Sequence, residues 1–396
     1  MTSRLLSVDE AQAIITAAVE PLGREPVALR DAHQRFLAEA VSAPLSLPPF
    51  TNSAMDGYAI RAADSPGCLE IIGESAAGHP FQGIVDPGKA VKISTGAALP
   101  RGADAIAILE QITLRDGLLL VPYAIPERRH LRETGSDVEA GTTVIQAGTR
   151  LGAVQVGTAA ALGFKMLTVG RRPSVAVVST GSELIAPGEP LPEGSIYDSN
   201  GPMLEALITS AGGLATVIPP PADEPEAVQA ALRQALTHDL VITTGGVSVG
   251  PHDIVRTIMA ELGVQERFWG VRMRPGKPLS FALHGRIPLF GIPGNPVSAL
   301  VCFELFVRPA LALLQGATDP LPTFQQRLLT TDVQPNPERD ELIRVRLDTA
   351  GALEPLHGQM SHQLTVSTEA DGLALIKSGN ELVKAATVVP YLPLRD

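Results

Sequence analysis

The sequence predicts a multidomain α/β protein, in which a central parallel-sheet α/β domain lies between two regions of short β strands. Two observations support this fold class. Between residues 172 and 317, apolar runs alternate with amphipathic helical segments, which is typical of a parallel sheet covered by helices on both faces. On either side, short apolar runs alternate with Gly, Pro and Asp turns, as in small β domains.

We predict four parts, since 396 residues are enough for about two to four domains. Residues 44–50 are too rich in proline for regular structure, which suits a segment that crosses between domains. The predicted parts are an N-terminal mixed helical and linker region (1–45 with 138–171), a small β-rich domain (46–137), the α/β domain (172–317) and a C-terminal β barrel or sandwich (318–396).

The composition argues against several classes of protein. A formal net charge of −11 disfavours a nucleic-acid or membrane-surface binder, so an anionic ligand requires local arginines and lysines. Cys68 and Cys302 cannot form a disulfide framework and fit a reducing compartment. Asp9 and Glu10 lie where a signal peptide would be basic or apolar, and no uninterrupted apolar run reaches the ~18 residues of a membrane span. We therefore expect a cytoplasmic protein.

The first 170 residues predict few helices and several strands. Ser7 to Glu10 has the pattern of a capping box, with an apolar helical stripe behind it. Two more helices are expected, over 32–40 and over 149–162, the latter ending at Gly163. Short strands are expected at 69–72, 90–93, 105–109 and 118–121.

The central region alternates regularly between the two patterns. The expected strands are 175–178, 214–218, 240–244, 264–269 and 289–292, and the expected helices are 200–211, 223–237, 251–262 and 296–314. The C-terminal region returns to short strands, at 342–347, 373–377 and 384–389.

Ligands of open α/β sheets bind outside the carboxyl ends of the strands. Three loops follow predicted strands at that edge: 179–183, 244–253 and 291–296. A stiff basic turn, Arg274-Pro-Gly-Lys-Pro278, adds two cationic side chains that could converge on an oxyanion.

The second of these loops is the most informative feature. An apolar strand runs into a loop with three glycines and then into a helix, so unpaired backbone N–H groups and the helix dipole favour an anion there. Asp253 would repel a phosphate unless a cation lay between them, which indicates a divalent metal, Mg²⁺. A tight strand-to-helix turn with an acidic N-terminus is the plain alternative.

Motifs along the whole chain resemble those of the molybdopterin molybdenumtransferases, the MoeA/gephyrin E-domain family. The signature is Pro48-Pro-Phe-Thr-Asn-Ser-Ala-Met-Asp-Gly-Tyr-Ala59. Further matching segments follow in the family's order, at 94–97, 179–184, 197–200, 243–253, 274–278 and 293–298.

The resemblance implies a central domain similar to molybdopterin adenylyltransferases. It also implies an elongated homodimer, with the active site between the α/β domain of one subunit and the 46–137 domain of the other. The implied reaction is Mg²⁺-dependent insertion of molybdate into adenylylated molybdopterin with release of AMP. Molybdopterin adenylyltransferase and molybdoenzyme maturation proteins are the implied partners.

The resemblance also implies roles for individual residues. Asp253 and Glu183 would hold the metal, and Asp223 would help to position the nucleotide. Molybdate would face Arg274 and Lys277, next to Pro278. The residues implied as catalytic are Asp56, Thr95, Glu183, Asp223, Asp253 and Lys277, and those implied in binding are Asp137, Asn200, Gly245, Gly246, Ser248, Gly250, Arg274, Pro278, Ser298, Arg344 and Ser361. Asp56, Thr95 and Asp137 would come from the partner subunit.

Several of these residues have simpler interpretations. Asp56 could cap a turn, and Asp137 could be a solvated loop acid. Asp223 and Asn200 could each cap the helix that follows. Arg344 and Arg346 alternate along a predicted strand, so both could belong to a solvent face.

The sequence also departs from the family pattern at several positions. Arg274 stands where a lysine is frequent, and Ser182 replaces a commonly acidic neighbour of Glu183. The segments 131–137 and 363–366 differ as well, which concerns Asp137 and the last domain.

Two other functions remain open. A molybdopterin adenylyltransferase would use a similar 243–253 loop, but would not need residues 44–170 or the β-rich tail. A non-catalytic scaffold like the gephyrin branch is the second alternative.

Overall fold

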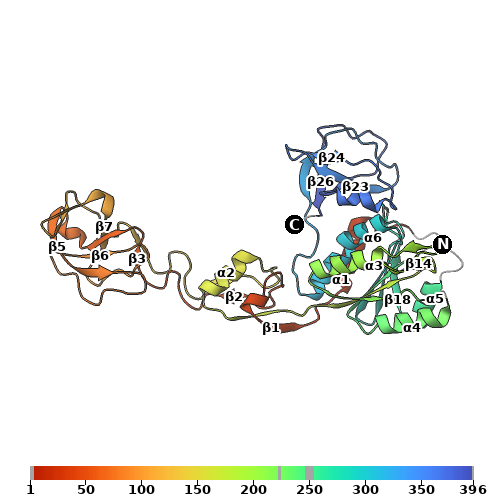
Figure 1. Cartoon of the computed structure of the whole chain (residues 1–396), viewed down its shortest axis with the longest axis horizontal. Coiled ribbons are helices and arrows are strands. Elements are labelled where there is room, and N and C mark those ends of the chain that lie inside the picture. The colour runs from red at the N-terminus through yellow and green to blue at the C-terminus, as the bar shows by residue number, and fades with distance from the viewer. Residues whose placement is uncertain (1–3, 222–223, 246–253, 395–396) are drawn as a thin grey trace. The chain divides into compact units, whose positions relative to one another are not determined.

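The computed structural model describes residues 4–221, 224–245 and 254–394 (Figure 1). The chain divides into two compact units. Unit 1 consists of Met1–Glu39, Ala147–Ala153 and Met166–Asp396, and unit 2 of Ala40–Gln146 and Val154–Lys165. The boundaries of the four predicted parts remain a prediction.

Unit 2 is built around a six-stranded sheet in the order β7-β4-β6-β5-β9-β8. The apolar runs predicted as strands are confirmed in this sheet, and Leu69, Ala90 and Leu119 lie in its core. The strands are β4 (Gly57–Ile60), β5 (Gly67–Ser75), β6 (Lys89–Ile93), β7 (Ala105–Ile108), β8 (Thr113–Arg115) and β9 (Leu118–Val121). Short antiparallel pairs complete the unit: β3 (Asn52–Ser53) with β10 (Leu131–Arg132), and β2 (Val41–Ser42) with β11 (Thr143–Ile145).

The helix predicted over 32–40 is wrong. Only a 3₁₀ turn, Leu29–Asp31, lies nearby, and the following residues pair with distant backbone. Leu37 N–H donates to the Thr149 carbonyl at 2.9 Å, and Ala38 N–H to the Thr168 carbonyl at 2.9 Å. Tertiary pairing therefore overrides local helix propensity. The same pairing delays the next helix, so α2 (Ala153–Ala161) begins later than predicted.

The central sheet of unit 1 has the strand order β16-β13-β17-β21-β20-β18. Its strands are β13 (Ser174–Ser179), β16 (Leu214–Ile218), β17 (Leu240–Thr244), β18 (Gln265–Trp269), β20 (Ser280–His284) and β21 (Ile287–Ile292). The first four strands in this order are parallel, as predicted, but β20 is antiparallel to both of its neighbours, β21 and β18. The sheet is therefore mixed, because Gly285, with φ +60°, closes a two-residue hairpin between β20 and β21 that was not predicted.

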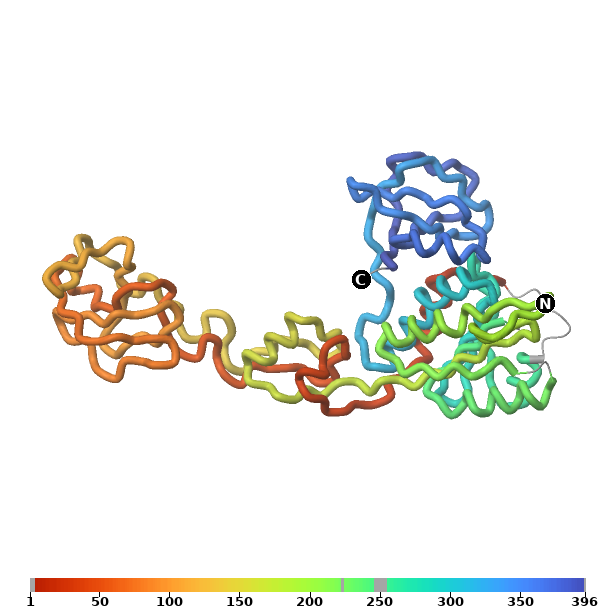
Figure 2. Tube along the Cα trace, viewed as in Figure 1, coloured from red at the N-terminus to blue at the C-terminus, as the bar shows by residue number. Residues whose placement is uncertain are grey.

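Helices cover both faces of this sheet (Figure 2). On one face α1 (Val8–Ala18), α3 (Asn200–Ser210) and the helical segment 296–314 pack against Val175, Val177 and Ile242. On the other face α4 (Pro225–Ala235) and α5 (Ile254–Glu261) pack against Val178 and Val241. The predicted capping box at the start of α1 is confirmed.

The helical segment 296–314 consists of α6 (Pro296–Cys302), a π turn (Phe303–Val307) and α7 (Arg308–Leu314). The π turn precedes Pro309, whose ring cannot continue the regular hydrogen-bond ladder. This segment is long and apolar enough to cross a membrane, but 78% of its most apolar window is buried. It is therefore a core helix of the α/β domain.

The C-terminal β domain has a sheet in the order β19-β23-β25-β26-β22, with β24 paired to β23. Its strands are β22 (Gln325–Leu328), β23 (Asp340–Leu347), β24 (Leu353–Pro355), β25 (Gly372–Ile376) and β26 (Val388–Pro393). A 3₁₀ helix spans Leu364–Thr368. The first strand, β19 (Met273–Arg274), belongs to the basic turn of the α/β domain, which is thus joined to this sheet.

The remaining strands of unit 1 form two further pairs. The pairs are β1 (Arg24–Ala28) with β12 (Met166–Gly170), antiparallel, and β14 (Leu184–Ile185) with β15 (Ile196–Tyr197), parallel.

Candidate active site at the carboxyl ends of the parallel strands

The three loops predicted at the carboxyl edge of the sheet converge in the structure. Thr180 N–H donates to the Thr244 carbonyl at 2.9 Å, and Gly245 N–H to the Ile292 carbonyl at 3.3 Å. A Cβ built on Gly294 would lie 3.5 Å from the Gly245 Cα. The convergence follows from the parallel pairing of β13, β17 and β21, which puts all three carboxyl ends at one edge.

The Asn200 side chain bridges the second and third of these loops. Its side-chain amide donates to Thr244 Oγ1 at 2.8 Å and to the Gly294 carbonyl at 2.7 Å. The alternative interpretation of Asn200 as a helix N-cap is wrong, because Asn200 is the first helical residue of α3 and Ser199 occupies the N-cap position. Its Oδ1 is buried and has no hydrogen-bond partner.

Asp198 is the acid that accepts hydrogen bonds from the first backbone N–H groups of α3, and the sequence reasoning did not single it out. Its Oδ1 accepts from the N–H groups of Asn200 and Gly201, each at 3.0 Å. Its Oδ2 accepts from the Ser179 hydroxyl at 2.8 Å. An acid two residues before a predicted helix was the available signal, since carboxylates stabilise helix N-termini.

Gly245 and Gly181 allow close contacts at this edge. Gly245 has φ +84°, and a Cβ there would collide with the Thr180 carbonyl oxygen. A Cβ on Gly181, with φ +142°, would come within 2.6 Å of the Glu183 carboxylate, so this exposed acid folds back over its own loop. Asp223, Gly246, Ser248, Gly250 and Asp253 lie outside the described residues.

The basic turn lies beside the C-terminal β domain. Arg274 forms an ion pair with Glu341 at 3.1 Å, which partly compensates its charge. Lys277 is exposed, and within the described ranges no carboxylate pairs with it. Its carbonyl accepts from Val271 N–H at 2.9 Å and fixes the turn ahead of Pro278.

Arg339 is a further cation that the sequence reasoning missed. It immediately precedes β23, whose first residue pairs with Met273 beside Arg274. Its side chain has no carboxylate partner in the part of the chain that the structure describes. A basic residue just before a predicted strand gave no distinguishing signal.

Ser298 and Ser361 lie where α6 contacts the C-terminal β domain. Val297 N–H, in the first turn of α6, donates to the Ser361 carbonyl at 3.1 Å, and Ser298 follows as a buried residue. Arg344 is also buried, with 1% of its surface exposed, so its interpretation as part of a solvent face is wrong. That interpretation is confirmed for its neighbour Arg346, which is exposed.

Asp56 and Thr95 lie together in unit 2. The backbone N–H and hydroxyl of Thr95 donate to Asp56 Oδ1 at 2.7 and 3.0 Å. These bonds, the backbone one foremost, lower the pKa of Asp56 below its ordinary value. Asp56 is thus held as an anion at an exposed turn, which fits both turn capping and catalysis. Asp137 is exposed, as a solvated loop acid would be.

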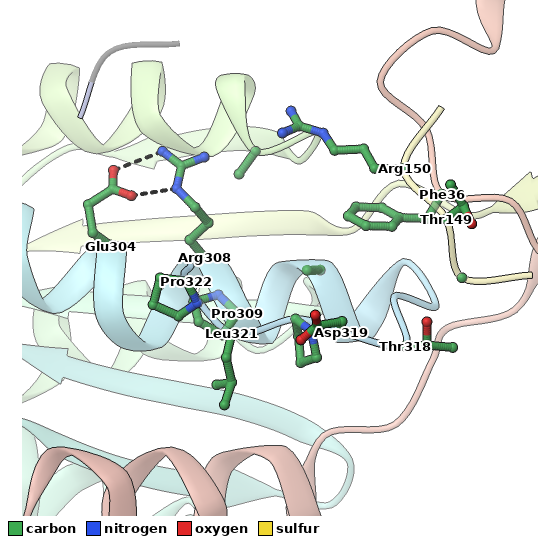
Figure 3. Close-up of a pocket in the computed structure, with 14 residues that line it drawn as sticks. Phe36, Thr149, Arg150, Glu304, Arg308, Pro309, Thr318, Asp319, Leu321 and Pro322 are labelled. Atoms are coloured by element: carbon green, nitrogen blue, oxygen red, sulfur yellow. Dashed lines mark hydrogen bonds and ion pairs between the residues drawn. The ribbon is translucent and has the colours of Figure 1, made fainter. Parts of the chain in front are cut away.

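A separate cavity of about 410 Å³ lies in unit 1 between α7 and the chain that follows it (Figure 3). It is lined by Phe36, Arg150 and the segment 318–322. Glu304 and Arg308 also line it and form a bidentate ion pair, in which Arg308 Nε and Nη2 donate to the two Glu304 carboxylate oxygens at 2.6 and 2.8 Å. The predicted site residues are not among those that line it.

No group of three or more His, Cys, Asp or Glu side chains suitable for a metal occurs among the described residues. At the carboxyl edge, both carboxylate oxygens of Asp198 accept hydrogen bonds from protein groups, whereas Glu183 is exposed. Such an edge suits Mg²⁺, which commonly takes one or two protein carboxylates together with substrate phosphates. It does not suit a closed structural metal site.

Family models match three consecutive parts of the chain. They are the MoeA N-terminal region (domains I and II) at residues 6–163, a probable molybdopterin binding domain at 176–313 and the MoeA C-terminal region (domain IV) at 326–394. The central match is the α/β domain that carries the three loops.

Proteins of known function or structure are similar over most or nearly all of this chain. Molybdopterin molybdenumtransferase 2 of Mycobacterium tuberculosis is 36% identical over 96% of this chain and 98% of its own. Molybdopterin molybdenumtransferase of Haemophilus influenzae is 38% identical over 79% of this chain and 78% of its own. The crystal structure of a molybdopterin biosynthesis MoeA protein from Pyrococcus horikoshii covers 98% of this chain and 100% of its own, with a TM-score of 0.85 and 29% identity.

Proposed function

The chain belongs to the MoeA family of molybdopterin molybdenumtransferases, enzymes of molybdenum cofactor biosynthesis, and on this premise we propose the reaction that its carboxyl edge performs. The proposed reaction is insertion of molybdate into adenylylated molybdopterin. Water cleaves the phosphoanhydride and AMP leaves. The two dithiolene thiols bind molybdenum, which stays hexavalent, while one oxo group of molybdate leaves as water with the two thiol protons.

The observation that carries this proposal is that α6 links two unlike surfaces of unit 1: it begins directly after the third loop, and its Cys302 Sγ lies 3.8 Å from the Gly276 carbonyl of the basic turn. The loops that follow β13, β17 and β21 converge and are held together by the Asn200 side chain and backbone hydrogen bonds. They form the proposed binding site for the pterin phosphate and the nucleotide. The turn 274–278 presents Lys277 without a carboxylate partner among the described residues, and Arg274 with one. Cationic donors of this kind bind tetrahedral oxyanions such as molybdate.

Mg²⁺ is proposed as the cofactor, with the carboxylates of Glu183 and Asp253 as its protein ligands. Of these two residues, Glu183 lies within the described ranges. When bound, it would neutralise phosphate charge during cleavage and polarise the attacking water. The residues of the chain itself hold the substrates: Asn200 aligns the loops, and Lys277 with Ser298 and Ser361 faces molybdate. Asp223 is proposed to position the nucleotide.

A homodimer is proposed in which Asp56, Thr95 and Asp137 of the partner subunit complete each site. The support is chemical: Asp56 is exposed yet held as an anion by two bonds from Thr95. Such a preformed carboxylate is ready to orient a substrate group. A cytoplasmic location is proposed as well, because the two cysteines are free and one is exposed. Molybdopterin adenylyltransferase and molybdoenzyme maturation proteins are proposed as suppliers and acceptors.

The test is incubation with adenylylated molybdopterin, Mg²⁺ and molybdate. We expect release of one AMP for each molybdenum transferred, and loss of AMP release in Asp253→Asn with the fold unchanged. Formation of adenylylated pterin from ATP would instead indicate an adenylyltransferase. Absence of both activities would support a scaffold.

Mixing experiments test the shared site. Asp56→Ala and Asp253→Asn proteins, each inactive alone, should regain activity when mixed under conditions that exchange subunits, because half of the sites in a hybrid dimer are intact. Persistent inactivity of verified hybrid dimers would contradict a site formed by two subunits.

A further inference from the structure

Asp198 is a buried carboxylate without a cationic partner among the described residues. It has 6% of its surface exposed, and in those ranges no arginine or lysine forms an ion pair with it. Its Oδ1 accepts from the N–H groups of Asn200 and Gly201, each at 3.0 Å, and its Oδ2 accepts from the Ser179 hydroxyl at 2.8 Å. Burying a charge is costly unless its polar atoms are satisfied, so these three donors make the position tolerable.

The same residue holds the chain on both sides of Glu183. Its carboxylate binds Ser179, the last residue of β13, which comes four residues before Glu183. Its backbone N–H donates to the carbonyl of Ile185, two residues after Glu183, at 2.9 Å. Between these two points, Ile196 N–H donates to the Glu183 carbonyl at 2.9 Å, within the parallel pair of β14 and β15. The backbone of Glu183 is therefore fixed by contacts that meet at Asp198.

Asp198 also connects Glu183 to the other two loops of the carboxyl edge. By accepting from the Asn200 N–H, it fixes the first residue of α3. The Asn200 side chain then donates to Thr244 Oγ1 at 2.8 Å and to the Gly294 carbonyl at 2.7 Å. The loop after β13 is thus bound to Asp198 directly, and the loops after β17 and β21 are bound to it through Asn200.

We propose that Asp198 is a positioning residue, which holds the Glu183 carboxylate at a fixed place relative to the loops after β17 and β21, so that the metal and the substrate phosphates meet there. It acts through the backbone, because its hydrogen bonds go to Ser179, Ile185, Asn200 and Gly201 and none to the Glu183 carboxylate. Groups that orient a metal ligand in this way contribute roughly 10- to 100-fold to metal affinity. The inference rests on the proposed role of Glu183 in binding Mg²⁺.

Three variants separate position from charge. Asp198→Ala removes all three hydrogen bonds of the carboxylate. Asp198→Asn removes the charge but can keep the geometry, since its oxygen can accept from the two N–H groups and its amide can donate to Ser179 Oγ. Ser179→Ala is the second variant in case Asp198→Ala does not fold, because it removes one link and leaves the carboxylate in place.

Asp239→Ala is the matched control. Asp239 accepts from the Ser174 N–H at 2.8 Å and from the Ser174 hydroxyl at 2.7 Å. Ser174 is the first residue of β13, so this carboxylate forms similar bonds at the end of the strand opposite the three loops. Asp198→Ala and Asp239→Ala should both lower the thermal midpoint, but only the first should disturb the site.

Three measurements are made on each protein. Amide exchange of the ligand-free protein at Leu184 and Ile196 should be at least about tenfold faster in Asp198→Ala and unchanged in Asp198→Asn and Asp239→Ala. The dissociation constant for Mn²⁺, followed by EPR in the presence of AMP, should rise about tenfold or more in Asp198→Ala, about threefold or more in Ser179→Ala, and not in Asp239→Ala. The half-saturating Mg²⁺ concentration for AMP release should rise in the same order.

Four results would overturn the proposal. An equal loss of Mn²⁺ affinity in Asp198→Asn and Asp198→Ala would show that the charge acts, and not the position. Faster exchange with wild-type Mn²⁺ affinity in Asp198→Ala would leave Asp198 a helix cap only. An equal loss in Asp239→Ala would indicate general destabilisation, and a wild-type protein that bound no Mn²⁺ would remove the metal that Glu183 is proposed to hold. If the wild-type protein bound Mn²⁺ but released no AMP, the proposed function would fail, whereas exchange and Mn²⁺ affinity would still decide the role of Asp198.

Discussion

The bridge that Asn200 forms between the loops after β17 and β21 gives a quantitative prediction for Asn200→Ala. The substitution removes two hydrogen bonds, to Thr244 Oγ1 at 2.8 Å and to the Gly294 carbonyl at 2.7 Å. The Thr244 hydroxyl still donates to the Pro293 carbonyl at 3.4 Å, so Thr244 loses only the bond that its oxygen accepts. The Gly294 carbonyl loses a donor in a buried setting, so the total cost should be about 2–4 kcal/mol.

The catalytic consequence follows from the same number. If about half of that energy, about 1–2 kcal/mol, serves to hold the loops in their reactive arrangement, AMP release should slow about 5- to 30-fold, since 1.4 kcal/mol corresponds to a factor of ten. Gln315→Ala is the matched control: this buried amide also donates two bonds, each at 2.9 Å, to the carbonyls of Ala211 and Leu311. Both variants should lower the thermal midpoint similarly, and Asn200→Ala alone should slow turnover.

The assay measures initial rates of AMP release at saturating substrates, beside a thermal unfolding scan of each variant. Equal rate losses in Asn200→Ala and Gln315→Ala would refute the reasoning, because the effect would then come from general destabilisation. A wild-type rate in Asn200→Ala with the expected loss of thermal midpoint would refute it as well, since the loops would not need this amide.

Three further predictions concern single side chains. Gly245→Ala should destabilise unit 1 and slow AMP release, because φ +84° is strained for alanine and its Cβ would collide with a backbone carbonyl. The thermal midpoint and the turnover rate measure these effects, and wild-type values of both would contradict the prediction. Lys277→Ala should raise the half-saturating molybdate concentration about tenfold or more with little change in the thermal midpoint, and an unaltered molybdate dependence would count against the contact. Asp239 has a pKa below its ordinary 3.8, since bonds from Arg171 and other donors outweigh the burial that raises it. A depressed pKa contributes stability above 3.8 that is lost as the pH falls further, so Asp239→Asn should flatten the acid side of the stability profile, and a profile identical to wild type would exclude this linkage.

The regular part of the fold was predictable from the sequence, because burial imposes simple patterns. The apolar runs of β13, β17 and β21 and the amphipathic helices between them specify parallel strands with one shared carboxyl edge. The convergence of the loops at that edge followed from this topology. The antiparallel β20 was not predicted, because a two-residue hairpin around Gly285 leaves little trace in a hydrophobicity pattern.

The contacts that depend on distant partners could not be predicted. The stretch 32–40 has a helical pattern, but its backbone N–H groups donate to carbonyls of residues 149, 151 and 168 instead of forming helical hydrogen bonds. Arg344 and Arg346 occupy equivalent places in an alternating strand pattern, yet one is buried among carbonyls and the other faces solvent. Only the path of the 358–363 segment separates them, and a sequence pattern does not show that path.

The most direct test of the central claim is to locate molybdate on the protein. Crystals soaked in molybdate with Mg²⁺ and AMP, measured at the molybdenum absorption edge, should give an anomalous peak within hydrogen-bonding distance of Lys277 and beside Ser298. A peak elsewhere, for example in the cavity next to Phe36 and Arg150, with none at the turn 274–278 would contradict the account.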